Sequence, residues 1–329
     1  MRIAIADADA LVNDCMKVVG YSPEEAKIIT DQVMGCELRG VTFGGLSRAL
    51  SLIERTRSGP PSREMRIERE TPVSALIDGG DQNGYLIAHK AVQLGIEKAK
   101  QSGIAVIGAN NTWYTGMYAH YLEMATDQGL VAMAAGSSAP RVAPHGSSEG
   151  RFGTNPIAFG FPSDDQPIIF DIGTSAMMIA EVVLAQRLGQ PLPEGMAFDK
   201  SGAATTDPAA ALAGAIKVWG GHKGAGLALV VQMLGILVGG GAMPADYRDC
   251  GFFFLAIMPD LFIEQSEFTA RISDYARTVR LARPVEPGAS VRMPFDRSAA
   301  TRARHLEQGA IEAPEAIVSE LRRIAGRPS

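Results

Sequence analysis

The chain has little cysteine and histidine, and it lacks the short motifs that identify several common enzyme classes. Its three cysteines show no metal-ligand spacing, and its five histidines are scattered with no His-Glu-x-x-His motif. We therefore expect no metal site. No Gly-x-Gly-x-x-Gly motif follows a strand pattern, and neither a Walker loop nor a Gly-x-Ser-x-Gly elbow occurs. These absences argue against a classical Rossmann domain, a P-loop nucleotidase and an α/β-hydrolase.

An excess of positive charge is also missing. The 329 residues carry a formal net charge of −5, which gives no support to a nucleic-acid partner. The first residues include Asp7 and Asp9 and no basic segment before an apolar run, so we expect no signal peptide. Few cysteines in a chain of this length indicate a reducing compartment, and we predict a cytoplasmic location.

One nearly uncharged stretch is long enough to cross a bilayer, from Gly224 to Met243. It is rich in glycine, carries Gln232 in its middle and has no flanking aromatic belt. Its composition therefore favours a buried core helix over a membrane span, and we expect no membrane association.

The order of hydrophobic patterns predicts an α/β protein. A capping box at Ser22 begins a helix over 23–38, and a second helix is expected over 46–57. The segment 63–70 is charged and is expected to be solvated. From Val73 to Leu281 strand patterns alternate with helix patterns, and polar helices close the chain. We predict two domains: a helical one from 1–72 and 282–329, and an α/β one from 73–281.

A loop of small polar residues suits a phosphate or ribose. Gly153, Thr154 and Asn155 precede an apolar strand and offer backbone N–H groups, a hydroxyl and an amide. A second strand is expected to end at Asp171, after which residues 173–175 would open a helix whose N-terminus could receive an anion.

Several stretches, taken together and in order, carry a resemblance to a known family. They are Arg39-Gly40 with Arg48, Asn83-Gly84, Glu123 to Ala125 with Gln128-Gly129, Arg141 to Gly146, Gly153 to Ala158, Asp171 with Thr174 to Ala176, Thr206 to Pro208, and Gly220 to Gly224. The set resembles the type-2 malate/L-lactate dehydrogenase family over nearly the whole chain. The resemblance implies an NAD(P)-dependent oxidoreductase with a mixed-sheet α/β cofactor domain, a helical domain from the two chain ends, and a homodimer.

The resemblance also implies roles for individual residues. Arg48 would hold the substrate carboxylate, a bidentate task that suits arginine. Phe43, Gly44, Trp113 and His145 would belong to the substrate pocket. The expected cofactor-binding residues are Gly153, Thr154, Asn155, Asp171, Thr174, Ser175, His222, Lys223 and Gly224. The cofactor would be NAD or NADP, with NADPH slightly favoured, and the substrate a small 2-oxo, 2-hydroxy or cyclic imino acid.

The chain departs from the family pattern where proton transfer is expected. The family normally has Ser-His where this chain has Phe43 and Gly44, and that histidine is its proposed acid/base. Tyr114 occupies a second position at which the family commonly has a histidine. Leu52, one helical turn after Arg48, occupies a position at which the family commonly has a tyrosine. The cofactor motifs match the family, whereas the proton-transfer motifs do not.

The missing histidine changes which substrates the site can reduce. A ketone needs a proton donor for the forming alkoxide, a role that Tyr114 could take. A protonated cyclic imine needs none during hydride addition. We therefore expect a reductase of a small 2-imino or 2-oxo acid, with the cyclic imino acid favoured. The alternatives are a 2-hydroxy acid dehydrogenase that uses Tyr114 as acid/base, and a nucleotide-binding homologue with lyase, hydratase or no activity.

Overall fold

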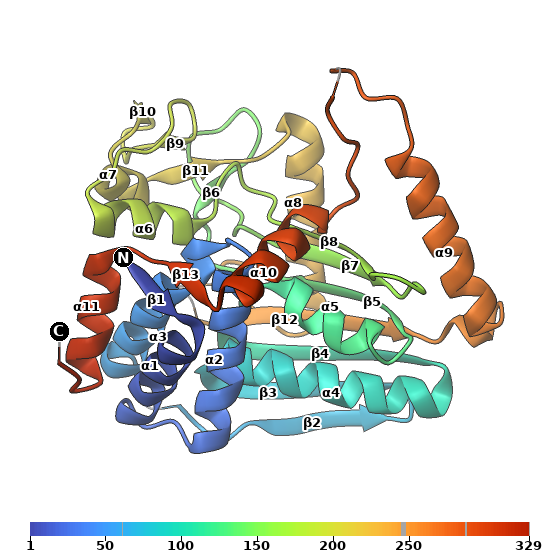
Figure 1. Cartoon of the computed structure of the whole chain (residues 1–329). Coiled ribbons are helices and arrows are strands. Elements are labelled where there is room, and N and C mark those ends of the chain that lie inside the picture. Colours follow the sequence, from blue (N-terminus) through green and yellow to red (C-terminus); the bar gives the residue numbers. More distant parts are fainter. Residues whose placement is uncertain (61, 245–247, 287, 329) are drawn as a thin grey trace.

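The computed structural model describes residues 1–60, 62–244, 248–286 and 288–328. Across the middle of this part of the chain runs a seven-stranded sheet (Figure 1). In spatial order its strands are β2 (Arg66–Thr71), β3 (Ser74–Asn83), β4 (Ile104–Trp113), β12 (Cys250–Ile257), β5 (Val131–Gly136), β7 (Ile157–Phe161) and β8 (Ile168–Ile172). Only the β3–β4 pair is parallel in this sheet, and the other described pairs are antiparallel. The predicted mixed-sheet α/β fold is therefore confirmed, and it is not the parallel sheet of a classical Rossmann domain.

The charged segment 63–70 does not remain irregular, because most of it forms the edge strand β2. All residues of β2 are exposed, and the strand pairs only with β3. An edge strand tolerates charged side chains on both faces, since neither face needs to be buried and the charges discourage pairing with another chain. The predicted solvent exposure is confirmed, and the strand is a feature that the sequence analysis did not assign.

Helices cover both faces of the sheet. The helices α4 (Gly84–Ser102) and α5 (Tyr118–Thr126) lie on one face, and α8 (Gly221–Leu237) lies on the other (Figure 1). The core under α4 and α5 is built on aromatic side chains such as Tyr121 and Phe254, whereas the core under α8 includes Val231 and Phe253. Adjacent residues of β12 thus serve the two faces, as the two-residue period of a strand requires.

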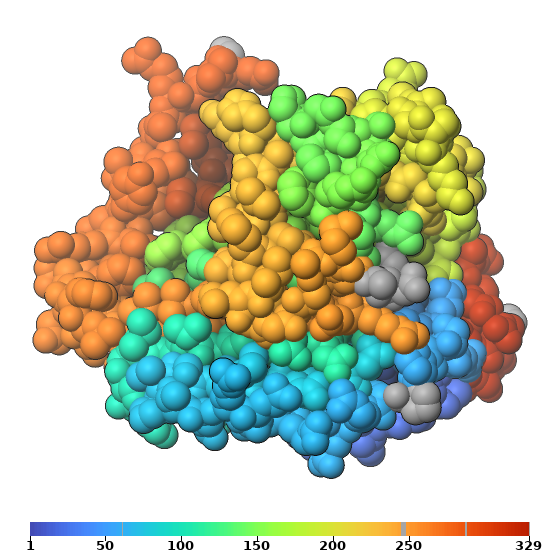
Figure 2. Space-filling model, turned by 180° about the vertical axis from the view of Figure 1, so that it is seen from behind, coloured from blue at the N-terminus to red at the C-terminus, as the bar shows by residue number. Residues whose placement is uncertain are grey.

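The helix α8 is apolar on both sides, and its outer side is not buried. Figure 2 shows it as a column on the back of the molecule. Its exposed apolar side chains are Leu229, Val230, Met233, Ile236 and Leu237. The prediction of a buried core helix holds for the side that faces the sheet and was wrong for the outer side, because the sheet covers only one side of the helix. None of the helices in the described ranges has the length and apolar character needed to span a membrane.

The two ends of the chain pack together as a helical layer. It contains α1 (Ile5–Val18), α2 (Pro23–Leu38), the short η1 helix (Thr42–Gly44), α3 (Leu46–Ser58) and α11 (Glu315–Ile324). The strands β1 (Arg2–Ala4) and β13 (Ala310–Glu312) pair antiparallel within this layer. One hydrophobic cluster joins residues of both chain ends, from Ile3 to Leu321. The capping box at Ser22 forms as expected.

A smaller sheet and several further helices make up the rest of the described chain. The small sheet has the order β10 (Ala204–Thr205), β9 (Ala197–Phe198), β11 (Ala215–Lys217) and β6 (Val142–Ala143), beside α6 (Ile179–Leu188) and α7 (Pro208–Ala213). After the short η2 helix (Pro259–Leu261), α9 (Gln265–Arg280) stands to one side in Figure 1, and the chain then returns through α10 (Asp296–Gln308).

Residues 173–175 do not open a helix. Ser175 forms a β-bridge with Val218, and the Ala176 amide donates to the Lys217 carbonyl, so the chain is extended there. The helix α6 begins only at Ile179. Asp171 also lies inside β8 rather than after its end. The expected helix N-terminus at residues 173–175 was therefore wrong, and backbone pairing with the small sheet is the reason.

Candidate functional site

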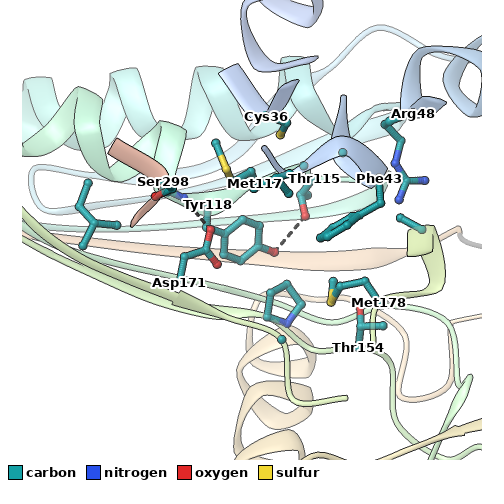
Figure 3. Close-up of a pocket in the computed structure, with 18 of the residues that line it drawn as sticks. Cys36, Phe43, Arg48, Thr115, Met117, Tyr118, Thr154, Asp171, Met178 and Ser298 are labelled. Carbon is teal, nitrogen blue, oxygen red and sulfur yellow. Dashed lines mark hydrogen bonds between the residues drawn. The ribbon is translucent and has the colours of Figure 1, made fainter. Parts of the chain in front are cut away.

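A cavity of about 600 Å³ lies where the helical layer, the sheet and the segment 292–298 meet. Figure 3 shows its residues, with Phe43 and Arg48 on one side and Asp171 on the other. The cavity is lined by six of the residues that the sequence singled out: Phe43, Gly44, Arg48, Tyr114, Thr154 and Asp171. These residues come from the η1–α3 turn, the end of β4 and the β7–β8 region, which are far apart in the sequence. The fold thus brings together predicted substrate-side and cofactor-side residues.

Arg48 and Tyr114 form a stacked pair on the cavity wall. The Arg48 guanidinium carbon lies 4.6 Å from the centre of the Tyr114 ring. Arg48 forms no salt bridge with a carboxylate of the described residues. Tyr114 has a φ of +50°, a left-handed conformation that is costly for a bulky residue and is found at functional sites. A guanidinium held by an aromatic face can still donate to a planar carboxylate.

Trp113 does not line the cavity. Its ring packs edge-on against Tyr114, with the ring centres 5.5 Å apart, and its Nε1 donates to the Asp81 carbonyl over 2.9 Å. The Arg55 guanidinium lies over its other side, 5.1 Å from the ring centre. Trp113 therefore supports Tyr114 from behind, and the apolar wall expected from Phe43 and Trp113 has only Phe43 at the cavity surface.

The Gly153–Asn155 loop is tied to α8 and to Ser138. The Asn155 side chain is buried; its Nδ2 donates to the Ala228 carbonyl and to Gln232 Oε1, over 2.9 and 3.0 Å. Its Oδ1 accepts from the Ser138 amide. These contacts use the Asn155 amide within the protein, so what the loop presents to the cavity is Thr154, whose hydroxyl lies 3.4 Å from Ser138 Oγ.

Thr174 is fully buried and binds back to this loop. Its Oγ1 donates to the Thr154 carbonyl over 3.0 Å, and its amide donates to the same oxygen over 2.8 Å. The Thr174 carbonyl in turn accepts from the Trp219 amide, just before α8. Thr174 and its neighbour Ser175 therefore connect the cavity wall to the start of α8, and neither lines the cavity.

The remaining predicted cofactor residues gather at the start of α8, outside the cavity lining. His145, which was expected in the substrate pocket, does not line the cavity either. Its ring packs edge-on against His222, with the ring centres 6.3 Å apart. Lys223 is exposed. Gly224 is buried, and a Cβ there would lie 1.6 Å from the Trp219 carbonyl oxygen, so only glycine fits. This second group of polar residues is joined to the cavity through Thr174 and Thr154.

Asp171 is the one carboxylate among the described residues that line the cavity. Its Oδ2 accepts a hydrogen bond of 2.8 Å from the Ala119 amide, at the first turn of α5 (Figure 3). Burial raises the pKa of this carboxyl to about 6, while the amides of Ala119 and Tyr118 act in the opposite direction. Asp171 can therefore change its protonation state near neutral pH.

The other weak acids of the cavity stay protonated near neutral pH where a shift is resolved. Burial raises the pKa of the Cys36 and Cys250 thiols to about 12. Burial also raises the pKa of Tyr85 and Tyr118 above the usual value of a phenol. The Tyr118 hydroxyl lies 2.9 Å from Thr115 Oγ1, as Figure 3 shows.

The sequence analysis missed the segment 292–298, which closes one side of the cavity. It contributes two exposed arginines, Arg292 and Arg297. The Arg39 guanidinium lies 5.3 Å from the centre of the Phe295 ring, which packs the segment against α2. The signal available in the sequence was a pair of arginines in a proline-bearing linker, and linkers of that kind are usually solvated.

The cavity residues fit a nicotinamide dinucleotide. The volume lies within the range of small-molecule and cofactor sites, and the lining combines apolar side chains with a few polar groups. Arg292 and Arg297 offer positive charge for phosphate groups at the cavity edge, and Thr154 and Ser138 offer hydroxyls for a ribose. Among the described residues, no group of His, Cys, Asp or Glu is arranged to hold a metal ion.

Comparisons with known proteins identify the family of the chain. Residues 3–322 match the malate/L-lactate dehydrogenase family. The chain is 31% identical to the malate/(S)-sulfolactate dehydrogenase of Methanothermus fervidus, over 99% of this chain and 97% of that protein. It is 32% identical to the Δ1-pyrroline-2-carboxylate reductase of Ancylobacter novellus, over 100% and 99% of the two chains. A dehydrogenase structure from Sinorhizobium meliloti superposes with a TM-score of 0.91 at 28% identity, over 99% and 98% of the two chains.

The family match spans almost the whole chain, and the relatives are dehydrogenases and reductases of small carboxylic acids. Such enzymes use a nicotinamide cofactor. The chain belongs to the malate/L-lactate dehydrogenase family and is an NAD(P)-dependent oxidoreductase.

Proposed function

We propose that this enzyme reduces a small 2-imino carboxylic acid, with a cyclic ketimine favoured over a 2-oxo acid. The observation that carries the proposal is the cavity wall at positions 43 and 44, where Phe43 and Gly44 replace the Ser-His pair of the family pattern. The Ancylobacter novellus relative is a reductase of a cyclic imino acid, which is consistent with this substrate class.

The proposed reaction assigns a task to each polar wall of the cavity. Arg48, held over the Tyr114 ring, binds the substrate carboxylate and orients C2. Phe43 covers the apolar ring of the substrate and excludes water. The cofactor supplies a hydride to C2. Thr154 lies on the cofactor side with Arg292 and Arg297, and neither NAD nor NADP is singled out by these contacts.

Position 44 is closed by packing. A Cβ at Gly44 would lie 3.0 Å from Cys36 Sγ and 3.3 Å from Cys36 Cβ, closer than ordinary van der Waals contact. Cys36 is fully buried on α2 and lines the cavity. A side chain at position 44 would therefore require Cys36 to shift by a few tenths of an ångström, so the residue tolerated at position 44 depends on the residue packed behind it.

A second candidate is reduction of a 2-oxo acid with Tyr114 as the acid. The observation that favours it is the phenolic side chain of Tyr114 beside Arg48, the proposed carboxylate-binding residue, with the guanidinium carbon 4.6 Å from the ring centre. The position of Tyr114 on the cavity wall supports this role.

We further propose a homodimer and a division into two domains. The exposed apolar side of α8 would be covered by a second copy of the chain, because a row of exposed Leu, Val, Met and Ile side chains marks an interaction site. The shared core of the two chain ends supports a helical domain from 1–72 and 282–329 and an α/β domain from 73–281, although β2 (Arg66–Thr71) pairs into the sheet of the α/β domain. The three buried free thiols are consistent with a cytoplasmic location.

The substrate class can be tested by steady-state kinetics. NADPH or NADH oxidation should be much faster with Δ1-piperideine-2-carboxylate or Δ1-pyrroline-2-carboxylate than with pyruvate or oxaloacetate. We expect kcat/KM values to differ by at least about 10²-fold, the usual contribution of a missing acid to a ketone reduction. Equal or reversed rates would contradict the ketimine preference. Tight cofactor binding without turnover would favour a non-redox homologue.

The role of Arg48 predicts a specific kinetic change. Arg48→Lys keeps the charge but loses the fork that matches a carboxylate, so KM should rise about tenfold or more with cofactor affinity unchanged. Arg57→Lys is the matched control, because Arg57 is exposed on the same helix and does not line the cavity. An unchanged KM for Arg48→Lys would place the carboxylate elsewhere.

The Cys36–Gly44 contact predicts a coupling in stability. Gly44→Ala should lower the free energy of unfolding by about 1–3 kcal/mol through overpacking. In the Cys36→Ala background, Gly44→Ala should lower the free energy of unfolding much less than it does in the wild type. The coupling energy of the two substitutions should be about 0.5 kcal/mol or more. Urea denaturation of the two single variants and the double variant measures it. Simple additivity would show that position 44 is not limited by Cys36.

The proposed dimer predicts that a charge on the outer side of α8 separates the subunits. Met233→Glu should convert the protein to a monomer in light scattering, because an unpaired carboxylate would be buried between two apolar surfaces. Val18→Glu is the control, since Val18 is an exposed apolar residue on α1. A monomeric wild-type protein would refute the dimer.

A further inference from the structure

The segment 292–298 forms the outer wall of the cavity, and only its second half belongs to a helix. We propose that residues 292–295 form a gate that opens to admit the cofactor and closes over it. Asp296 is the latch of this gate, and Phe295 is its hinge. The gate serves the cofactor, so it does not depend on which substrate the enzyme reduces.

The gate lies between the cavity and solvent. Arg292, Met293, Pro294 and Phe295 all line the cavity, and Arg292 and Pro294 are also exposed. These four consecutive residues belong to no helix or strand, since α10 begins at Asp296. Their displacement would open the cavity without disturbing the sheet.

The chain that leads into the gate is not fixed to the body of the protein. Among its described residues, 281–286 and 288–291, the hydrogen bonds are local. The Leu281 and Ala282 amides donate to carbonyls at the end of α9, and the Ala289 amide donates to the Glu286 carbonyl. Leu281 and Val285 are exposed. Figure 1 shows this linker rising away from the sheet between α9 and α10. It can therefore follow the gate when the gate moves.

The helices on either side of the linker are fixed to the body. In α9, the Ser273 hydroxyl accepts a hydrogen bond of 3.0 Å from the Asp164 amide. In α10, His305 Nδ1 lies 2.9 Å from the Leu38 carbonyl oxygen. Movement is thus confined to the chain between the two helices, which ends at the gate.

Asp296, the first residue of α10, holds the gate by its backbone. The Met293 amide donates to Asp296 Oδ2 over 2.8 Å. Arg280, at the end of α9, orients the same carboxylate. The Arg280 Nε donates to Oδ2 over 3.0 Å, and its Nη2 donates to Oδ1 over 2.7 Å. The Arg280 hydrogen bond lowers the pKa of Asp296, so the latch is ionised at neutral pH.

Phe295 is held in place by packing and strained in its backbone. Its ring lies 5.3 Å from the Arg39 guanidinium carbon and packs against the core under α4 and α5. Its φ of +76° is left-handed, which is costly for a bulky residue. Rotation of this torsion to a negative value would relieve the strain and move residues 292–294 away from the cavity. Packing therefore favours the closed position, and backbone strain favours the open one.

A bound dinucleotide would add to the forces that close the gate. Arg292 lies on the gate and lines the cavity, and an arginine there is suited to binding phosphate oxygens. Since this contact exists only in the closed position, the cofactor shifts the gate towards that position. The latch and the cofactor thus stabilise the same state.

Trypsin can measure the opening, because Arg292 is a cleavage site within the gate. Cleavage after Arg292 reports the open position, since a protease needs an extended stretch of chain. Without cofactor, Asp296→Asn and Arg280→Gln should each speed this cleavage about threefold or more, because each removes the same ion pair. Arg277→Gln is the matched control, since Arg277 pairs with Asp274 within α9. This control should be cleaved at the wild-type rate.

Two variants of Phe295 separate a hinge from a simple loss of packing. Phe295→Ala and Phe295→Gly lose the same ring contact, but only glycine adopts a positive φ without strain. Both should be cleaved after Arg292 faster than the wild type. The rate should be about threefold or more higher in Phe295→Ala than in Phe295→Gly. Equal rates in the two variants would show that position 295 is not the hinge.

The cofactor should act on the same cleavage. NADPH and NADH are added separately at saturating concentration, and the one that binds should slow cleavage of the wild type after Arg292 about tenfold. Stopped-flow fluorescence should show the cofactor leaving Asp296→Asn about threefold faster than the wild type. Cleavage after Lys200, in an exposed turn between β9 and β10, reports general loosening and should be equal in all variants. Wild-type rates after Arg292 in both latch variants, equal acceleration at Lys200, or no effect of a bound cofactor would overturn the gate.

Discussion

A buried ion pair joins the helical layer to the helices on the sheet, beside the cavity. Arg39, at the end of α2, pairs with Glu123 of α5, and only 2% of the arginine side chain is exposed. Its guanidinium also packs against Phe295 of the cavity-lining segment. Removal of one partner from such a pair leaves a buried charge and costs about 3–5 kcal/mol. The same helix, α5, begins with the Ala119 amide bound to Asp171, so its position fixes the cavity's carboxylate as well.

The cavity contains few charged side chains, so each of them contributes strongly to the electrostatics of the site. Arg48 contributes a cation to the cavity wall and Asp171 contributes a carboxylate. Sulfhydryl, methyl and aromatic groups lie between these two side chains. Electrostatic interactions are stronger in such surroundings than in water, because little solvent screens them. The carboxylate of a small substrate therefore interacts more strongly with Arg48 here than it would in water.

Local patterns in the sequence predicted the elements whose character is set locally. The helix that begins at the Ser22 capping box ends at Leu38 as expected, and the strand and helix alternation from Val73 onward gave the right fold class. The failures have tertiary causes. Residues 173–175 follow the pattern of a helix start, but pairing with Val218 holds them extended. The apolar composition of α8 predicts a core helix, yet the sheet covers only one of its sides.

The same distinction applies to the site. Motif spacing identified Phe43, Arg48, Tyr114 and Asp171, because each lies in or beside a recognisable turn or strand end. Arg297 lines the cavity because the chain folds back after α9, and no local sequence pattern predicts this return.

The cavity wall around position 44 differs from the family pattern at position 43 as well, and Cys36 packs against both the cavity and Gly44. Cys36 fills the space in which a side chain at position 44 would begin, and Phe43 turns an expected polar position into an aromatic surface. A histidine at position 44 would have to displace a fully buried thiol, so the present packing disfavours its return. The chemistry of proton supply must then rest on residues that the fold already holds in the cavity.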